Sequence, residues 1–207
     1  MADLQPALDY LAVNEGGYTV DDGGPTNWGV TAATAASVIG YTGSMTAFTY
    51  QQATQVYQQG FWGPMNLSAL TSQAVANAIF DQAVNWGVGG VGAIVQAALD
   101  DPSIAWGGTD DGQWGPATLA AVNASDPNTF LVAFSAAALA AYQVLAQSTP
   151  SDQVYLNGWT NRANRILTLQ SGVAGIAATV TQNPGATIGI GTAILLAFAF
   201  IVWGGTK

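Results

Sequence analysis

The stretch EGGYTVDDGGPTNWGVT, residues 15–31, separates an apolar helical pattern from a chain that is helical over most of its remaining length. Leucines recur at helical spacing before it, and Glu15 falls on the same face, four residues after Leu11. The pattern predicts a helix that begins near Asp3 and ends at the two glycines after Glu15. A Gly- and Asp-rich loop with a short hairpin is expected to follow.

Glu15 is the only glutamate in the chain, which makes it the first candidate for chemistry. A carboxyl group at the end of an apolar helix face is poorly solvated, so its pKa rises and it can act as a general acid. Asp21 and Asp22 could return to face Glu15 and assist it, and Thr26 and Asn27 supply hydrogen-bonding groups. The alternative is a helix end followed by an ordinary polar turn.

The composition excludes several classes of function. The 207 residues contain no Cys and no His, which removes thiolate and imidazole metal sites and catalytic triads built on His. The formal net charge is -9, with only 3 Lys and Arg residues, so we expect no nucleic-acid partner. We also expect no cofactor and no metal ion. Carboxylates and tyrosines remain for proton transfer.

A second polar pattern lies further along the chain. Asn77, Asp81 and Asn85 form a row at steps of four residues, and Trp86 follows with glycines after it. This pattern predicts the edge of a substrate groove with an aromatic platform. A solvated helix face is the alternative.

Six further segments are expected to be helical. The first is capped at Thr49 and stopped at Gly60. The six segments span residues 47–62, 70–87, 93–101, 116–124, 128–148 and 155–170.

The C-terminal part has a different composition. Residues 186–203 carry no charge and are long enough, at about 27 Å as a helix, to cross a bilayer. Residues 171–185 are rich in Gly, Ala and Thr and are expected to be a linker. We therefore predict a C-terminal transmembrane helix, with a buried helix as the alternative. The N-terminus has no features of a secretory signal.

Several motifs, taken in order, resemble one known family, the N-acetylmuramidases of glycoside hydrolase family 108. They are Glu-Gly-Gly-Tyr at 15–18, GGPTNWGVT at 23–31, QATQVYQQGFW at 52–62, FDQAVNWG at 80–87, DGQWGPATLAAV at 111–122 and NGWTNRANRI at 157–166. Together they cover about residues 4–167.

The resemblance implies an all-α, mainly helical, lysozyme-like fold, and the predicted transmembrane helix lies outside the region that the resemblance covers. A catalytic region at 1–90 would be followed by a peptidoglycan-binding-like helical region at 91–170. The resemblance also implies hydrolysis of the β-1,4 bond between N-acetylmuramic acid and N-acetylglucosamine, with Glu15 as the catalytic acid.

The expected substrate contacts come from the same motifs. They are Tyr18, Thr26, Asn27, Asp81, Asn85 and Trp86. The DGQWG segment could bind glycan or stem peptide, or it could pack as part of the enzyme, with Asp111 forming a turn and Trp114 filling the core.

The sequence thus predicts a membrane-anchored muramidase of viral origin. Its partners would be bacterial peptidoglycan, a lipid bilayer through residues 186–203, and other virion proteins. We expect it in an internal virion membrane or the host inner membrane, with the catalytic region directed at the cell wall. Two alternatives stay open: a lytic transglycosylase that forms 1,6-anhydro ends, and a non-catalytic wall-binding or structural virion protein.

Overall fold

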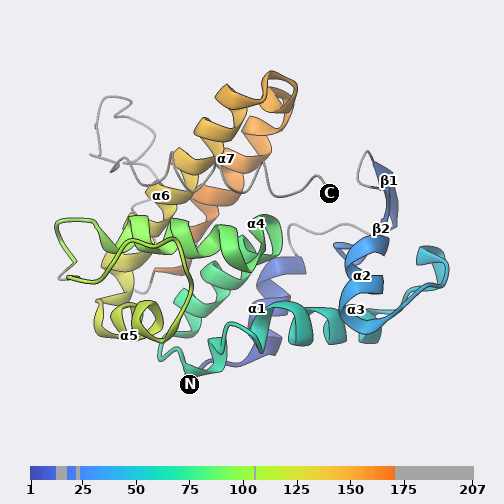
Figure 1. The fold of residues 1–207 in the computed structure, drawn as a ribbon, viewed down its shortest axis with the longest axis horizontal. Helices are drawn as coiled ribbons and strands as arrows, with labels where there is room; N and C mark the ends of the chain where they lie inside the picture. The colour runs from blue at the N-terminus through green and yellow to red at the C-terminus, as the bar shows by residue number, and fades with distance from the viewer. Residues whose placement is uncertain (13–17, 22–23, 105, 171–207) are drawn as a thin grey trace. The chain divides into compact units, whose positions relative to one another are not determined.

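The computed structural model describes residues 1–12, 18–21, 24–104 and 106–170 (Figure 1). Within them the chain is mainly helical, as predicted, and fits an all-α lysozyme-like domain. The predicted linker and transmembrane helix lie outside the described residues. The chain divides into two compact units, Met1–Asn85 and Trp86–Lys207.

The first unit combines short helices with a small antiparallel sheet. Its elements are α1 (Leu4–Ala12), β1 (Thr19–Asp21), β2 (Gly24–Asn27), β3 (Val30–Thr31), α2 (Ala32–Ile39), a 3₁₀ turn (Met45–Ala47), α3 (Tyr50–Tyr57), a π-helical turn (Gln58–Trp62), a second 3₁₀ turn (Leu67–Ala69) and the first part of α4 (Gln73–Leu99).

The predicted hairpin is a three-stranded sheet in the order β1-β2-β3, with Thr19 opposite Thr26 and Asn27 opposite Val30. Helix α2 follows β3 directly, and sequence analysis missed it. It is capped by Thr31, whose side chain accepts a hydrogen bond from the Thr34 backbone N–H.

Helix α1 is fixed at its start by Gln73, the first residue of α4. The Asp3 N–H donates to Gln73 Oε1 at 2.7 Å, and Gln73 Nε2 donates back to the Asp3 carbonyl at 2.9 Å. Leu8 and Leu11 are buried, as their spacing predicts. The described helix ends at Ala12, and the predicted end at the two glycines lies outside the described residues.

Helix α3 begins where the sequence predicts. Thr49 and Gln52 form a capping box, in which each side chain accepts a hydrogen bond from the other residue's backbone N–H. The predicted stop at Gly60 is wrong, because the chain continues through a π-helical turn to Trp62. Trp62, the last residue of this turn, is buried, and its ring centroid lies 5.6 Å from that of Phe80.

Helix α4 joins two of the predicted helices into one element. Gly87 interrupts it with φ 72° and ψ 165°, values far from helical geometry. A residue with a Cβ rarely adopts this positive φ, so a glycine is required at the interruption. The kink falls two residues after the end of the first unit.

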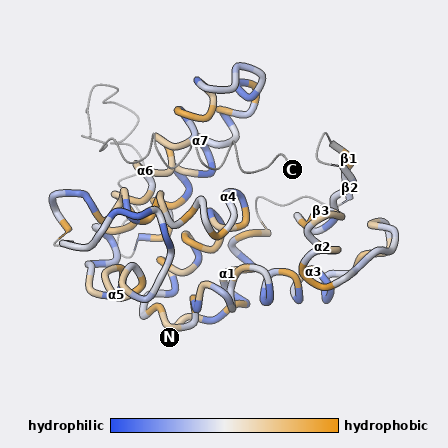
Figure 2. The backbone as a smooth tube through the Cα atoms, in the orientation of Figure 1, coloured by the Kyte–Doolittle hydropathy of each residue, from blue (hydrophilic) through white to orange (hydrophobic). Residues whose placement is uncertain are grey.

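The second unit contains the remaining helices. They are α5 (Pro116–Ala124), α6 (Pro127–Ser148), a 3₁₀ helix (Pro150–Tyr155), α7 (Leu156–Arg165) and a final 3₁₀ turn (Ile166–Leu169). Figure 2 shows hydrophilic residues in the connection between α4 and α5.

Helix α6 is the packing centre of the second unit. It lies beside α7 (Figure 1), and Ser135 Oγ donates to the Ala163 carbonyl of α7 at 2.9 Å. It is also the only helix of the described residues that is long and apolar enough to cross a membrane, but most of its apolar stretch is buried within the protein. These contacts make α6 a core helix of the second unit.

Candidate functional site

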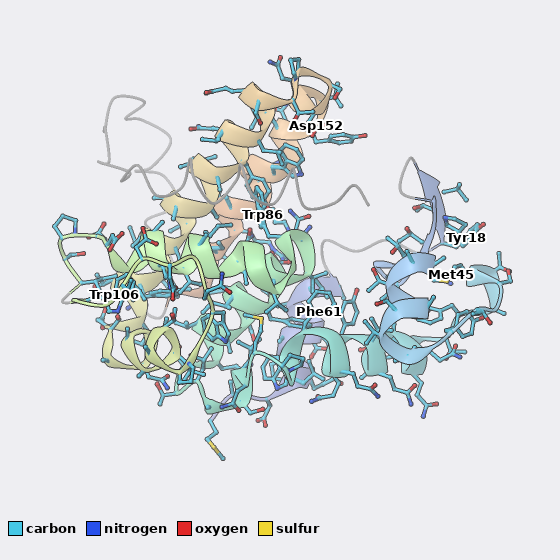
Figure 3. The ribbon with its side chains drawn as sticks, in the orientation of Figure 1. Tyr18, Met45, Phe61, Trp86, Trp106 and Asp152 are labelled. Atoms are coloured by element: carbon cyan, nitrogen blue, oxygen red, sulfur yellow. The ribbon has the colours of Figure 1, made fainter. Side chains whose placement is uncertain are left out.

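The first unit contains most of the residues predicted to act on a substrate. Glu15 and Asp22 lie outside the described residues. Asp21 is the last residue of β1, and Tyr18 precedes that strand with 48% of its surface exposed. Figure 3 shows Tyr18 beside the sheet, at the same end of the unit as Met45. Tyr18 and the backbone of Asp21 therefore lie on the hairpin that follows Glu15 in the chain.

Asn27 anchors this hairpin to the rest of the unit. Its side chain is buried, and Nδ2 donates to the carbonyls of Met45 at 2.9 Å and Phe48 at 3.3 Å. A sugar contact of Asn27 would therefore have to come from Oδ1. Thr26 is half-buried, and its hydroxyl lies 3.5 Å from the Gly24 carbonyl.

The turn between β2 and β3 has an unusual residue at its centre. Trp28 and Gly29 form this two-residue turn with φ 53° and 72°. Positive φ at both positions is the requirement of a type I′ turn, in which Asn-Gly is preferred. A bulky residue in such a conformation is an outlier that costs of order 1–3 kcal/mol.

Trp28 is held in this conformation from several sides. Its indole Nε1 donates to the Phe48 carbonyl at 3.2 Å, and its own carbonyl accepts a hydrogen bond from the Tyr57 hydroxyl at 2.8 Å. Its ring packs edge to face with Tyr50, with 5.5 Å between the centroids. Sequence analysis did not single out Trp28 or Tyr50. The available signal was an aromatic residue directly before a turn glycine.

The predicted polar row on α4 is mostly inside the protein. Asn77 and Asp81 are buried, and only Asn85 is exposed. Gln73 Nε2 donates to Asn77 Oδ1 at 2.7 Å, and Gln82 Nε2 lies 3.3 Å from Asp81 Oδ2. The interpretation as a solvated face is therefore wrong for Asn77 and Asp81. Their hydrogen bonds favour a structural role, and a substrate contact stays a prediction.

Trp86 belongs to a stack of aromatic rings in the second unit. Its ring centroid lies 4.9 Å from that of Tyr142, which is fully buried. Tyr142 stacks in turn on Trp159, with 5.3 Å between the ring centroids. The ring of Trp159 also packs against that of the exposed Tyr155, with 5.8 Å between the centroids. Trp86, labelled in Figure 3, is only half-buried. The stack gives it a packing role, so a sugar contact would need the remaining exposed part of its ring.

The DGQWG segment is fixed to α4 by Gln96. Gln96 Nε2 donates to Asp111 Oδ1 at 2.8 Å and to the Gln113 carbonyl at 2.9 Å. Gln96 Oε1 accepts a hydrogen bond from the Gly112 N–H at 2.6 Å. Asp111 also accepts from the Gln113 N–H, as in an Asx turn. Asp111 is thus a turn former, and Trp114 is half-buried.

The connection between α4 and α5 carries four aspartates, Asp100, Asp101, Asp110 and Asp111. Hydrogen bonds from Gln96 and Gln113 lower the pKa of Asp111. Partial desolvation, followed by the nearby charges of Asp100 and Asp111, raises the pKa of Asp110. Because the folded state disfavours the charged form of Asp110, this carboxylate destabilises the fold at neutral pH.

We expect Asp110→Asn to raise Tm at pH 7 by a small amount, about 1 °C, since the group is largely solvated. Because the pKa of Asp110 is raised in the folded state, its carboxylate lowers the stability of the fold most at pH values above that pKa. Below the unfolded value of 3.8 the group is protonated in both states, so this loss of stability is absent. Thermal melts at pH 7 and pH 3 check this. An advantage of equal size at both pH values would contradict it.

The described residues contain no group of three or more His, Cys, Asp or Glu side chains that could hold a metal ion. The Asp111 carboxylate accepts hydrogen bonds from Gln96 and from the Gln113 N–H.

Two family models match successive parts of the chain. Residues 8–87 match the model described as glycosyl hydrolase 108, which we abbreviate GH108. Residues 93–164 match the model described as a predicted peptidoglycan domain. The chain is GH108-like. The two matches together support a glycoside hydrolase with peptidoglycan as its partner.

A solved structure resembles this GH108-like chain over most of its length. The structure of SagA from Brucella abortus superposes with a TM-score of 0.65 at 27% sequence identity, and the match covers 79% of this chain and 91% of that one. A search of curated proteins finds no significant match.

Proposed function

We propose that this chain hydrolyses the β-1,4 bond between N-acetylmuramic acid and N-acetylglucosamine in peptidoglycan. The observation that carries the proposal is the match of residues 8–87 to the GH108 model, directly followed by a match to a peptidoglycan domain. The mainly helical fold and the similarity to SagA are consistent with it.

In this proposal Glu15 is the general acid. It protonates the glycosidic oxygen while the bond from that oxygen to the anomeric carbon breaks, so the departing sugar leaves as a neutral alcohol. The positive charge that develops on the remaining ring is stabilised by a nearby carboxylate, for which Asp21 and Asp22 are the candidates. Water then adds to the anomeric carbon and gives up a proton to one of the carboxylates, which completes the hydrolysis.

The second unit is proposed to hold the wall polymer while the first unit cuts it. The rigid attachment of the DGQWG turn to Gln96 supports a structural role for this segment. Binding would then depend on other surfaces of residues 93–164, which match the peptidoglycan domain.

We also propose that residues 186–203 attach the enzyme to a membrane in a viral setting. Support comes from the sequence alone, as these residues form an uncharged stretch of spanning length. Flotation of the full chain with phosphatidylcholine vesicles tests the attachment. We expect the full chain to float with them and a variant with Leu195→Asp and Phe198→Asp to stay behind. Equal flotation of both proteins would contradict the proposal that residues 186–203 attach the chain to the membrane.

Product chemistry tests the proposed reaction. Purified sacculi are digested with the full chain, and the soluble fragments are treated with borohydride before mass spectrometry. Hydrolysis leaves reducing ends that take up two hydrogen atoms, whereas 1,6-anhydro ends do not react. We expect reducible N-acetylmuramic acid ends.

Other outcomes point to the alternatives. Anhydro ends would identify a lytic transglycosylase, in which a sugar hydroxyl replaces water. If the folded protein pelleted with sacculi and released no fragment, it would be a wall-binding protein and the enzyme proposal would be wrong.

A further inference from the structure

The first unit displays an aromatic pair that the proposed reaction does not use. Trp28 and Tyr50 are 43% and 44% exposed, although they come from different elements, the β2-β3 turn and the start of α3. Their rings meet at an interplanar angle of 70°. We call these two rings the Trp28–Tyr50 platform.

Trp28 stays exposed although its backbone conformation is strained. The turn prefers Asn before Gly29, and a tryptophan at φ 53° is strained. The indole N–H is already bonded to the Phe48 carbonyl, so the exposed part of the ring offers apolar and π surface only. Strain of this kind, held by surrounding bonds, is typical of functional positions.

The surroundings of the platform favour an uncharged, hydroxyl-rich ligand. Residues 23–80 contain no charged side chain at all. Side chains near the pair in sequence are hydroxyl and amide groups, among them Thr46, Thr49 and Gln51, and all three residues are exposed. An acidic or basic partner would find no opposite charge among residues 23–80, whereas a sugar offers C–H faces to aromatic rings and hydroxyls to polar groups.

We propose that the Trp28–Tyr50 platform binds a pyranose ring of the peptidoglycan glycan strand and so positions the strand for the enzyme. The inference rests on the proposed function, and it adds two residues to the predicted substrate contacts. The exposed Tyr18 precedes β1, which pairs with the strand leading to Trp28, and belongs to the same hairpin (Figure 3). Trp28 therefore lies on the hairpin segment that follows Glu15 in the chain, and α3 adds Tyr50.

The substitution Trp28→Asn separates function from folding. It creates Asn-Gly, the preferred sequence of a type I′ turn, so the turn can form without the strain, although the bond to Phe48 is lost. Tyr50→Leu keeps an exposed apolar side chain and removes the ring. Trp28→Phe keeps a ring. The matched control is Gln55→Leu, which alters an exposed residue of α3 outside the platform.

The test measures binding and turnover of peptide-free glycan strands by the full chain. We expect Trp28→Asn and Tyr50→Leu to raise Kd and KM about tenfold each while kcat changes less than threefold, because a ring that stacks on a bound sugar stabilises the ground state and the transition state equally. Trp28→Phe should stay within about threefold of the parent in Kd, and Gln55→Leu should match the parent. Thermal melts monitor folding.

The outcomes separate this inference from the proposed function. If the parent cuts strands and both Trp28→Asn and Tyr50→Leu keep its Kd and KM, the proposal that the platform binds glycan is wrong. The proposed function then stands. If the parent binds strands without cutting them, and these variants lose binding, the platform stands and the proposed reaction is wrong. A parent that neither binds nor cuts strands would overturn both.

Discussion

Replacing Glu15 by Gln is expected to lower the rate of fragment release from sacculi by about 10³-fold, while binding to sacculi and Tm stay close to those of the parent. Glutamine has nearly the same shape as glutamate and can donate a hydrogen bond, but it cannot transfer a proton to the leaving oxygen. Loss of general acid catalysis by a positioned side chain typically costs 10²- to 10⁴-fold.

Two controls make this result specific to Glu15. Asp9→Asn removes another carboxylate of the first unit, on the exposed side of α1, and should leave the rate unchanged. Asp21→Asn tests the proposed second carboxylate. If Glu15→Gln retained more than a tenth of the parent rate, another group would be the acid and the central assignment would fail.

The second large effect concerns the stability of the second unit. We expect Gly92→Ala to destabilise the second unit by about 3 kcal/mol. A Cβ at this buried position would lie 2.7 Å from both the Gly112 carbonyl oxygen and the Trp114 backbone nitrogen. Backbone atoms cannot rotate away as a side chain can, and this loop is also held by Gln96 one helical turn further along α4. The clash must therefore move either the loop or the helix.

Gly89→Ala is the matched control on the same helix. A Cβ at Gly89 meets nothing within 4 Å, and alanine stabilises a helix interior by roughly 0.5–1 kcal/mol relative to glycine. Thermal and denaturant unfolding of both variants measure the difference. Equal stability of the two would show that the loop does not lie on Gly92 as described.

The parts of the fold that follow from local patterns could be predicted. The Thr49 cap, the Pro116 start and the long apolar α6 each carry their signal within a few residues. Helix α2 was missed because it is short and Ala-rich and lacks a clear apolar stripe. The sequence did carry signals for its two ends, because Thr31 is a favourable N-cap residue and Gly40 a favourable C-cap residue. In the structure Gly40 is the C-cap, with φ 67°.

The site was harder to predict because its contacts are distant in sequence. The buried Asn27 amide pairs with carbonyls about twenty residues away, and no local pattern distinguishes that role from sugar binding. Periodicity placed Asn77 and Asp81 on one face but could not show that this face is buried. The strained φ of Trp28 is likewise visible only in the structure.

The central claim is that Glu15 makes this chain a glycan hydrolase, and one comparison tests it most directly. The full chain and Glu15→Gln are incubated side by side with the same sacculi, and the released muropeptides are quantified by mass spectrometry. We predict reducing-end muropeptides from the parent and almost none from the folded variant. Equal release from both, or no release from a folded parent, would contradict the claim.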